Sequence, residues 1–171
     1  MILLADIGAT NARFSVTSDC SKYEHCDNLQ VVGSDSLEEL CKDYLNRYQF
    51  ENKVNKAVIG VAAPIIDDEV SFVNANISFS IQGLKKQLFK EGLIVINDLA
   101  LQAHAIKSLK KSELSFIGLH KLQAKGPKLL VSPGTGLGLA GITDQEIIST
   151  EAGHLNISQK ETKHDLMKII D

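Results

Sequence analysis

The sequence predicts an α/β fold built around a mixed β-sheet, and three observations point to it. The chain opens with a β-hairpin pattern, it then alternates apolar strands with helices, and its second half contains another hairpin. Alternation of strands and helices is typical of sheets that carry helices on their faces, whereas a hairpin adds antiparallel pairing. Chemistry in such sheets gathers at the carboxyl ends of the strands, so polar residues that follow a strand are the first site candidates.

The first hairpin is predicted from two short runs and the turn between them. Ile2–Ile7 is apolar, Gly8–Asn11 consists of turn-forming residues, and Ala12–Thr17 alternates between apolar and polar residues. A polar loop is expected over Ser18–Asn28, with a short strand at Leu29–Val32 after it.

The clearest helix signal covers Ser36–Tyr48. Its apolar residues recur at the spacing of one helical face, which predicts a helix that packs on the core. They are Leu37, Leu40, Cys41, Tyr44, Leu45 and Tyr48. Ser36 and Glu39 have the spacing of a capping box, which places the start of the helix at Ser36.

Two apolar runs without alternation predict buried strands. The first is Lys56–Ala63, which Pro64 ends, and the second is Leu93–Ile96. The other elements expected in this half are a short strand at Val70–Val73 and helices at Ile81–Phe89 and Leu99–Leu109.

A polar stretch, Lys107–Glu113, marks a domain boundary. We therefore expect one domain over residues 1–112 and the opening part of a second over residues 113–171. The elements predicted beyond the boundary are a strand at Leu129–Ser132, a hairpin of Leu137–Thr143 and Glu146–Ser149, and a helix at Glu161–Ile170.

Composition excludes several classes of protein. Hydrophobic residues make up 44% of the 171 residues and charged residues 23%, which is typical of a globular chain and not of a disordered one. The net charge of −3 argues against a nucleic-acid surface and against a polybasic membrane anchor. The longest apolar run, Ala57–Ile66, is too short to span a bilayer, and the N-terminus has no signal-peptide pattern.

The three cysteines, Cys20, Cys26 and Cys41, are odd in number and lack the spacing of a metal site. We interpret them as reduced, half-buried thiols of a cytoplasmic protein.

The first glycine turn has the chemistry of a phosphate-binding loop. A tight turn with small residues exposes backbone N–H groups, and hydroxyl and amide side chains add donors. The residues concerned are Gly8, Ala9, Thr10 and Asn11. Asp6, at the end of the preceding strand, is suited to hold a hydrated Mg²⁺ through water. An ordinary hairpin turn remains the alternative.

A second glycine turn contains Gly134, Thr135 and Gly136. It lacks the Gly-Lys-Ser/Thr of a Walker A loop. Gly136–Gly141 matches the dinucleotide-binding pattern, but the residues after it are typical of a strand and not of the helix that this pattern requires. Two such turns, one in each half, suggest a nucleotide held between two related domains.

Asn97 and Asp98 follow an apolar strand. A carboxylate at this place can accept the proton of an attacking hydroxyl, which is what phosphoryl transfer to an alcohol needs. The alternative is that Asp98 caps the helix that follows, and the two roles are compatible.

Three further polar residues are candidate ligands. Glu151 and His154 lie three apart on a segment of small residues and are suited to bind adjacent sugar hydroxyls, and Asn74 follows a predicted strand. The alternatives are a solvated loop for the first two and a turn residue for the third. A metal site is disfavoured because no third ligand has the right spacing.

Taken together, these segments resemble bacterial glucokinases of the hexokinase-like type. Five motifs carry the resemblance, in the family's order and along the whole chain. They are Ala5–Phe14 (ADIGATNARF), Ile59–Ile65 (IGVAAPI), Val95–Ala100 (VINDLA), Val131–Gly138 (VSPGTGLG) and Glu151–His154 (EAGH).

The resemblance implies an actin/hexokinase-like fold with two RNase H-like domains. It implies transfer of the γ-phosphoryl group of ATP to the 6-hydroxyl of glucose, or of a similar hexose, with Mg²⁺. Asp98 is then the catalytic base, and Asn74, Asn97, Glu151 and His154 are sugar ligands. The two glycine turns bind the phosphates, and a homodimer is common in the family.

The chain departs from the family pattern at several points. Ala9 replaces a glycine, and related ATPases carry threonine there, so we expect a Cβ to be tolerated. Val73 and Ile77 replace the Thr and Trp of a sugar-site motif, and Ala152 replaces the first glycine of EGGH.

Family members are also considerably longer than this chain, so we expect it to be truncated, with one wall of the ATP cleft incomplete. Two alternatives stay open. One is a non-catalytic sugar-binding or regulatory module, and the other is a ROK-type or acetate-kinase-like transferase acting on another acceptor. The absence of the zinc-binding Cys/His cluster of many ROK proteins weighs against the second.

Overall fold

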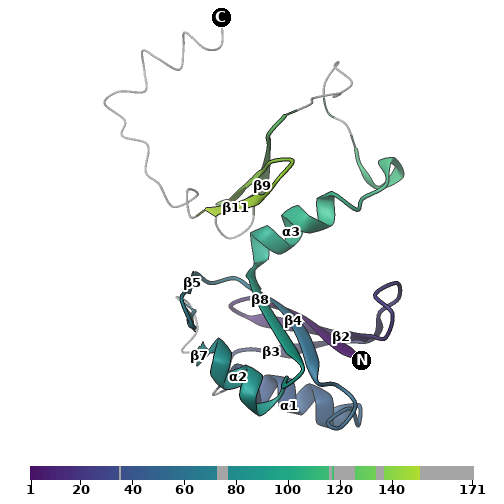
Figure 1. The fold of residues 1–171 in the computed structure, drawn as a ribbon, viewed down its shortest axis with the longest axis vertical. Helices are drawn as coiled ribbons and strands as arrows, with labels where there is room; N and C mark the ends of the chain where they lie inside the picture. Colours follow the sequence, from purple (N-terminus) through teal and green to yellow (C-terminus); the bar gives the residue numbers. More distant parts are fainter. Residues whose placement is uncertain (35, 73–76, 116, 118–125, 134–136, 151–171) are drawn as a thin grey trace, which may run out of the picture. The chain divides into compact units, whose positions relative to one another are not determined.

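The computed structural model describes residues 1–34, 36–72, 77–115, 117, 126–133 and 137–150 (Figure 1). The chain forms two compact units, Met1–Leu109 and Lys110–Asp171. The division between them falls inside the polar stretch Lys107–Glu113.

A five-stranded mixed sheet forms the centre of the first unit, as the sequence predicts. Its strands, in spatial order, are β3 (Glu24–Gln30), β2 (Asn11–Thr17), β1 (Ile2–Ile7), β4 (Lys56–Val61) and β8 (Gly92–Asn97). The strands β1, β2 and β3 are antiparallel neighbours, whereas β1, β4 and β8 run parallel. The hairpin and the central position of β4 are therefore confirmed.

Helices α1 (Leu37–Arg47) and α2 (Ile81–Gln87) cover one face of this sheet (Figure 1). The apolar stripe of α1 is buried as predicted, except that Tyr48 is half-buried and lies just after the helix. Ser36 caps the helix by accepting a hydrogen bond from the Glu39 N–H at 3.1 Å. A third helix, α3 (Asp98–Ile106), follows β8 directly. None of the helices in the described ranges has the length and apolar content needed to cross a bilayer.

The core lies between the sheet and the helices α1 and α2. Every second residue of a strand points to the same side, so alternate strand residues face these helices. Leu3, Ala5 and Ile7 of β1 and Ala57, Ile59 and Val61 of β4 are all buried. Tyr44 of α1 stacks on Phe14 of β2, with 5.1 Å between the ring centroids. The opposite face of the sheet is only half-buried at Leu4 and Val58.

A small antiparallel sheet precedes α2. Its strands are β5 (Ile65–Ile66), β6 (Glu69–Ser71) and β7 (Ser78–Ser80). Asp68 accepts hydrogen bonds from the Ser80 hydroxyl and from the Gln82 N–H, and these bonds lower the pKa of its carboxyl. Ser80 in turn caps α2, so one polar cluster joins the turn of this sheet to the start of the helix.

The second unit contains a three-stranded antiparallel sheet in the order β11 (Ile147–Thr150), β10 (Leu137–Ile142) and β9 (Lys128–Pro133). The predicted hairpin around Asp144 is confirmed by the pairing of β10 with β11. A 3₁₀ turn at Lys111–Glu113 begins the unit, and the helix expected at Glu161–Ile170 lies outside the described residues.

Two sequence predictions about the sheet were wrong. The loop expected over Ser18–Asn28 contains most of β3, whose residues are polar because this edge strand is largely exposed. The strand expected to be buried at Leu93–Ile96 is the opposite edge, β8. Its Leu93 and Val95 pack on the core, but Ile94 is 60% exposed, since nothing among the described residues covers the outer face there.

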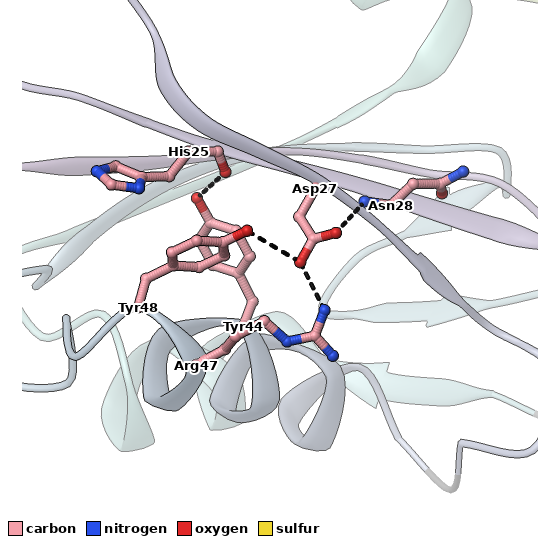
Figure 2. A network of polar contacts seen from close by, with 6 residues as sticks. All are labelled: His25, Asp27, Asn28, Tyr44, Arg47 and Tyr48. Atoms are coloured by element: carbon pink, nitrogen blue, oxygen red, sulfur yellow. Dashed lines mark hydrogen bonds and ion pairs between the residues drawn. The ribbon is translucent and has the colours of Figure 1, made fainter.

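The edge strand β3 is tied to α1 by a polar cluster (Figure 2). Its residues are His25, Asp27, Asn28, Tyr44, Arg47 and Tyr48. Asp27 accepts hydrogen bonds from Arg47 at 2.6 Å, from the Tyr48 hydroxyl at 3.3 Å and from the Asn28 N–H at 2.8 Å. Partial burial raises the pKa of Asp27, but these three contacts outweigh it, and its pKa lies below the ordinary value.

The same strand contains a bulge, and a side chain of α1 bonds to one of its carbonyl groups. The register of β3 against β2 shifts between Phe14 and Val16, and His25, in the bulged stretch, has a left-handed φ of 54°. The Tyr44 hydroxyl donates to the His25 carbonyl at 2.8 Å, so the bulge is held by a helix residue that also stacks in the core.

The Asp27 contacts predict a pH-dependent contribution to stability. Because the pKa of Asp27 is lower in the folded state, its contribution is complete above the unfolded-state pKa of about 4 and is lost as the pH falls through the folded-state value. We expect Asp27→Asn to lower the free energy of unfolding by about 1 kcal/mol at neutral pH. Urea titrations at several pH values should show this difference shrinking in acid. Asp43→Asn, at an exposed position of α1, is the control.

The cysteines differ in accessibility, which corrects the expectation that all three are half-buried. Cys20 and Cys26 are exposed, whereas Cys41 is buried, and burial together with the charge of Glu38 raises its pKa to about 12. We expect a thiol reagent such as Ellman's reagent to modify Cys20 and Cys26 in the folded protein and Cys41 only after unfolding. Rapid modification of all three thiols in the folded protein would contradict the burial of Cys41.

Candidate functional site

The carboxyl ends of three parallel strands lie level with one another. Ile7 of β1 pairs in register with Val61 of β4, and Val61 pairs with Asn97 of β8. The Ala62 N–H donates to the Ile7 carbonyl at 2.9 Å, which continues the pairing one residue beyond β4. The turn after β1 and the start of α3 therefore leave the sheet at the same end, where the parallel strands finish.

The turn after β1 is fixed by a hydrogen bond within the turn and by hydrogen bonds from residues at the end of β3. The Gly8 N–H donates to the Asn11 carbonyl at 2.9 Å, and the Thr10 carbonyl accepts from the Val31 N–H at 2.9 Å. The Asn11 Oδ1 accepts from Gln30 Nε2 at 3.0 Å. The Gly8 N–H is thus already used, and the groups of this turn suited to donate to a ligand are the Ala9 and Thr10 N–H groups, the Thr10 hydroxyl and the Asn11 amide NH₂.

Ala9 fits this turn without strain. Among the described residues, the non-glycine residues with a left-handed φ are Cys20, His25, Gln49 and Asp67, and Ala9 is not one of them. A Cβ at position 9 therefore needs no unusual backbone, in agreement with the expectation from the sequence.

Asp6 forms an ion pair that sequence reasoning missed. Arg13 lies opposite Asp6 in the β1–β2 register, and its Nη1 is 3.2 Å from Asp6 Oδ2. The side chains are 74% and 46% exposed, and ion pairs this accessible are weak. Asp6 can consequently exchange Arg13 for another cation at little cost. The hairpin register could have predicted this ion pair, since residues 6 and 13 are equidistant from the turn.

Asn97 is the cap of α3, a role that the sequence reasoning gave to Asp98. Its Oδ1 accepts hydrogen bonds from the Leu99 N–H at 3.0 Å and from the Ala100 N–H at 3.3 Å. These bonds satisfy two of the N–H groups that lack partners at a helix start. The side-chain oxygen of Asn97 therefore holds the start of α3.

Asp98 is the first residue of α3 and is half-buried. Its Oδ1 accepts from the Leu99 N–H at 2.9 Å, which holds the carboxylate against the helix start. The helix dipole favours a negative charge in the first turn.

Several candidates lie outside the described residues. They are Asn74, Gly134, Thr135, Gly136, Glu151 and His154. The structure therefore brings together the first turn and the Asn97–Asp98 pair, and it leaves the other candidates untested. Ile77, at the position where the family motif has Trp, is 3% exposed and belongs to the core.

A magnesium ion fits Asp6 only in a hydrated form. The described residues contain no group of three His, Cys, Asp or Glu side chains that could hold a metal ion directly. A half-exposed carboxylate at a strand end fits a Mg²⁺ that keeps most of its water, which is how this ion binds beside phosphates.

The glucokinase family model matches residues 3–170. The chain belongs to the glucokinase family. Among curated relatives, a glucokinase of Campylobacter jejuni subsp. doylei is 34% identical over 161 residues, which are 91% of this chain and 48% of the relative. A glucokinase of Helicobacter pylori is 32% identical over 163 residues, with the same shares. The chain thus spans about half the length of the curated relatives that it matches.

Solved structures of glucokinases have the same fold. The glucokinase of an Antarctic psychrotroph superimposes with a TM-score of 0.76 and 30% identity over 99% of this chain and 55% of that one. A ROK family glucokinase of Streptomyces griseus, solved with glucose and AMPPNP, has a TM-score of 0.61 at 17% identity over 92% of this chain and 51% of that one. The expected actin/hexokinase-like class is confirmed by these neighbours.

The cap contributed by Asn97 predicts a measurable loss of stability. Asn97→Ala removes the side-chain acceptor of the Ala100 N–H and one of the two acceptors of the Leu99 N–H, and we expect the free energy of unfolding to fall by about 1 kcal/mol. Asn97→Ser should retain most of the wild-type free energy of unfolding, because serine also caps helices. Urea denaturation measures both, with Asn46→Ala on the exposed side of α1 as control. Equal losses in the alanine and serine variants would disprove the capping role.

Proposed function

We propose that the chain carries the first half of the catalytic machinery of an ATP-dependent glucokinase. The reaction is transfer of the γ-phosphoryl group of ATP to the 6-hydroxyl of glucose. The observation that supports it most is the common sheet edge at which the Gly8–Asn11 turn and Asp98 emerge, in a chain that belongs to the glucokinase family. A glucokinase of Balamuthia mandrillaris was solved with glucose, and the Streptomyces enzyme with glucose and AMPPNP.

In this proposal Asp98 is the general base. Its carboxylate accepts the proton of the sugar hydroxyl while the hydroxyl oxygen forms a bond to the γ-phosphorus and the bond to ADP breaks. Asn97 donates from its NH₂ group to a sugar hydroxyl. The cap keeps both residues in place before the substrate arrives, which reduces the entropy lost in reaching the reactive arrangement.

The turn after β1 serves as the first phosphate-binding site. Ala9, Thr10 and Asn11 donate to phosphate oxygens, and Gly8 keeps the turn closed through its bond to Asn11. Asp6 would hold a hydrated Mg²⁺, which would neutralise phosphate charge.

The remaining assignments follow the family motifs. We assign Gly134, Thr135 and Gly136 to the second phosphate loop, and Asn74, Glu151 and His154 to the sugar. Residues 1–112 then form the small RNase H-like domain, and residues 113–171 the opening part of the large one. We further propose that the protein acts in the cytoplasm, with no nucleic-acid or membrane partner, and forms a homodimer.

The test is glucose-dependent release of ADP by the 171-residue chain with Mg²⁺ and ATP. We expect Asp98→Asn to lower kcat by about 10²–10⁴-fold, because a correctly placed base contributes that much. The affinity for glucose, measured by calorimetry, should change far less. Asp43→Asn, an exposed carboxylate on α1, is the matched control and should keep the wild-type rate.

Three outcomes separate the possibilities. Release of ADP that Asp98→Asn does not reduce would show that the base is another group. Glucose binding without any release would favour a sugar-binding module, the alternative that the sequence left open. If the wild-type chain neither binds glucose nor releases ADP, residues 1–171 do not form the site by themselves.

A further inference from the structure

Gly60 is a glycine that its backbone does not require. It lies inside β4, and among the described glycines only Gly33 and Gly126 have a left-handed φ. Glycine in a strand interior costs stability, because it has no side chain to pack and loses more conformational freedom on folding. A glycine at such a place points to another group that approaches the backbone closely.

That group is Leu101 of α3. A Cβ built on Gly60 would lie 2.6 Å from Leu101 Cδ2 and 3.7 Å from Leu101 Cγ. Carbon atoms in van der Waals contact are about 3.5–4.0 Å apart, so a methyl group at position 60 would require the Leu101 side chain to move. Leu101 therefore rests directly on the backbone of the central parallel strand, on the face opposite α1 and α2.

The position of this contact links the two halves of the proposed site. Gly60 pairs with Asp6 of β1 on one side and with Ile96 of β8 on the other. Leu101 follows Asp98 by three residues, and residues at this spacing are neighbours along one side of a helix. The contact thus joins the helix that begins with Asp98 to β4, the strand that pairs with β1 beside the turn.

We propose that Leu101, seated on Gly60, is a positioning residue that sets where the Asp98 carboxylate lies relative to the turn after β1. The cap at Asn97 closes the start of α3 but does not determine the rotation of the helix over the sheet. The Leu101–Gly60 contact supplies that second constraint, one helical turn beyond Asp98. The catalytic part of this proposal rests on the function proposed above for Asp98.

The test uses four variants of the 171-residue chain: Gly60→Ala, Leu101→Ala, the double variant, and Gly92→Ala as control. Gly92 is a strand glycine of the same sheet, where an added Cβ would meet only Lys56 Cγ at 3.8 Å, an ordinary contact. NMR then follows the Asp98 carboxyl carbon and the Leu99 and Ala100 amides, which report the start of α3. Urea denaturation reports global stability in parallel.

We expect Gly60→Ala to shift these three resonances and Gly92→Ala to leave them in place. In the double variant the added methyl group at position 60 fills part of the space vacated at 101, so the shifts should be smaller than in either single variant. Additive shifts, or shifts in Gly60→Ala no larger than in Gly92→Ala, would overturn the proposal.

Turnover distinguishes this proposal from the one on which it rests. We expect kcat to fall by about tenfold or more in Gly60→Ala, with KM for ATP changed by less than about twofold and partial recovery in the double variant. If the resonances behave as expected but Asp98→Asn leaves turnover intact, the contact stands and the base assignment fails. If Asp98→Asn abolishes turnover and the resonances do not respond to Gly60→Ala, the contact has no positioning role.

Discussion

The structure of the first unit depends on the in-register pairing of three parallel strands. Because β1, β4 and β8 end level with one another, the segments that follow them all start at the carboxyl end of these strands. A slip of one residue would move every side chain to the other face and would bury Asp6 against α1. The register is held by the alternation of buried residues along β1 and β4, so the packing of the core decides where the polar edge lies.

Much of this fold could be predicted because its signals are local. The stripe of α1 and the apolar run of β4 each lie within a dozen residues, and both were identified correctly. The strand β3 was missed because its residues are polar, and it is stabilised by pairing with β2 and by the contact of Asp27 with Arg47, 20 residues away. The burial of β8 was misjudged because an apolar run does not reveal whether a second layer covers it.

The candidate site divides in the same way. The glycine turn and Asn97–Asp98 were visible as polar residues after apolar strands, which requires only the order of elements. The sequence did not show that Asn97, and not Asp98, caps α3. Asn and Asp are comparable caps, and the choice depends on which residue leaves the strand last. The ion pair of Arg13 with Asp6 requires the hairpin register, and the approach of Leu101 to Gly60 requires the packing of α3 against β4.

The two edges of the sheet differ in how readily they would accept a foreign strand. The outer strand β3 is polar and interrupted by the bulge at His25, and these are features by which natural sheets prevent edge-to-edge association. The outer strand β8 is a regular six-residue run with Ile94 largely exposed. Self-association of this chain at high concentration would therefore begin at β8, and a charged residue in place of Ile94 would improve its solubility.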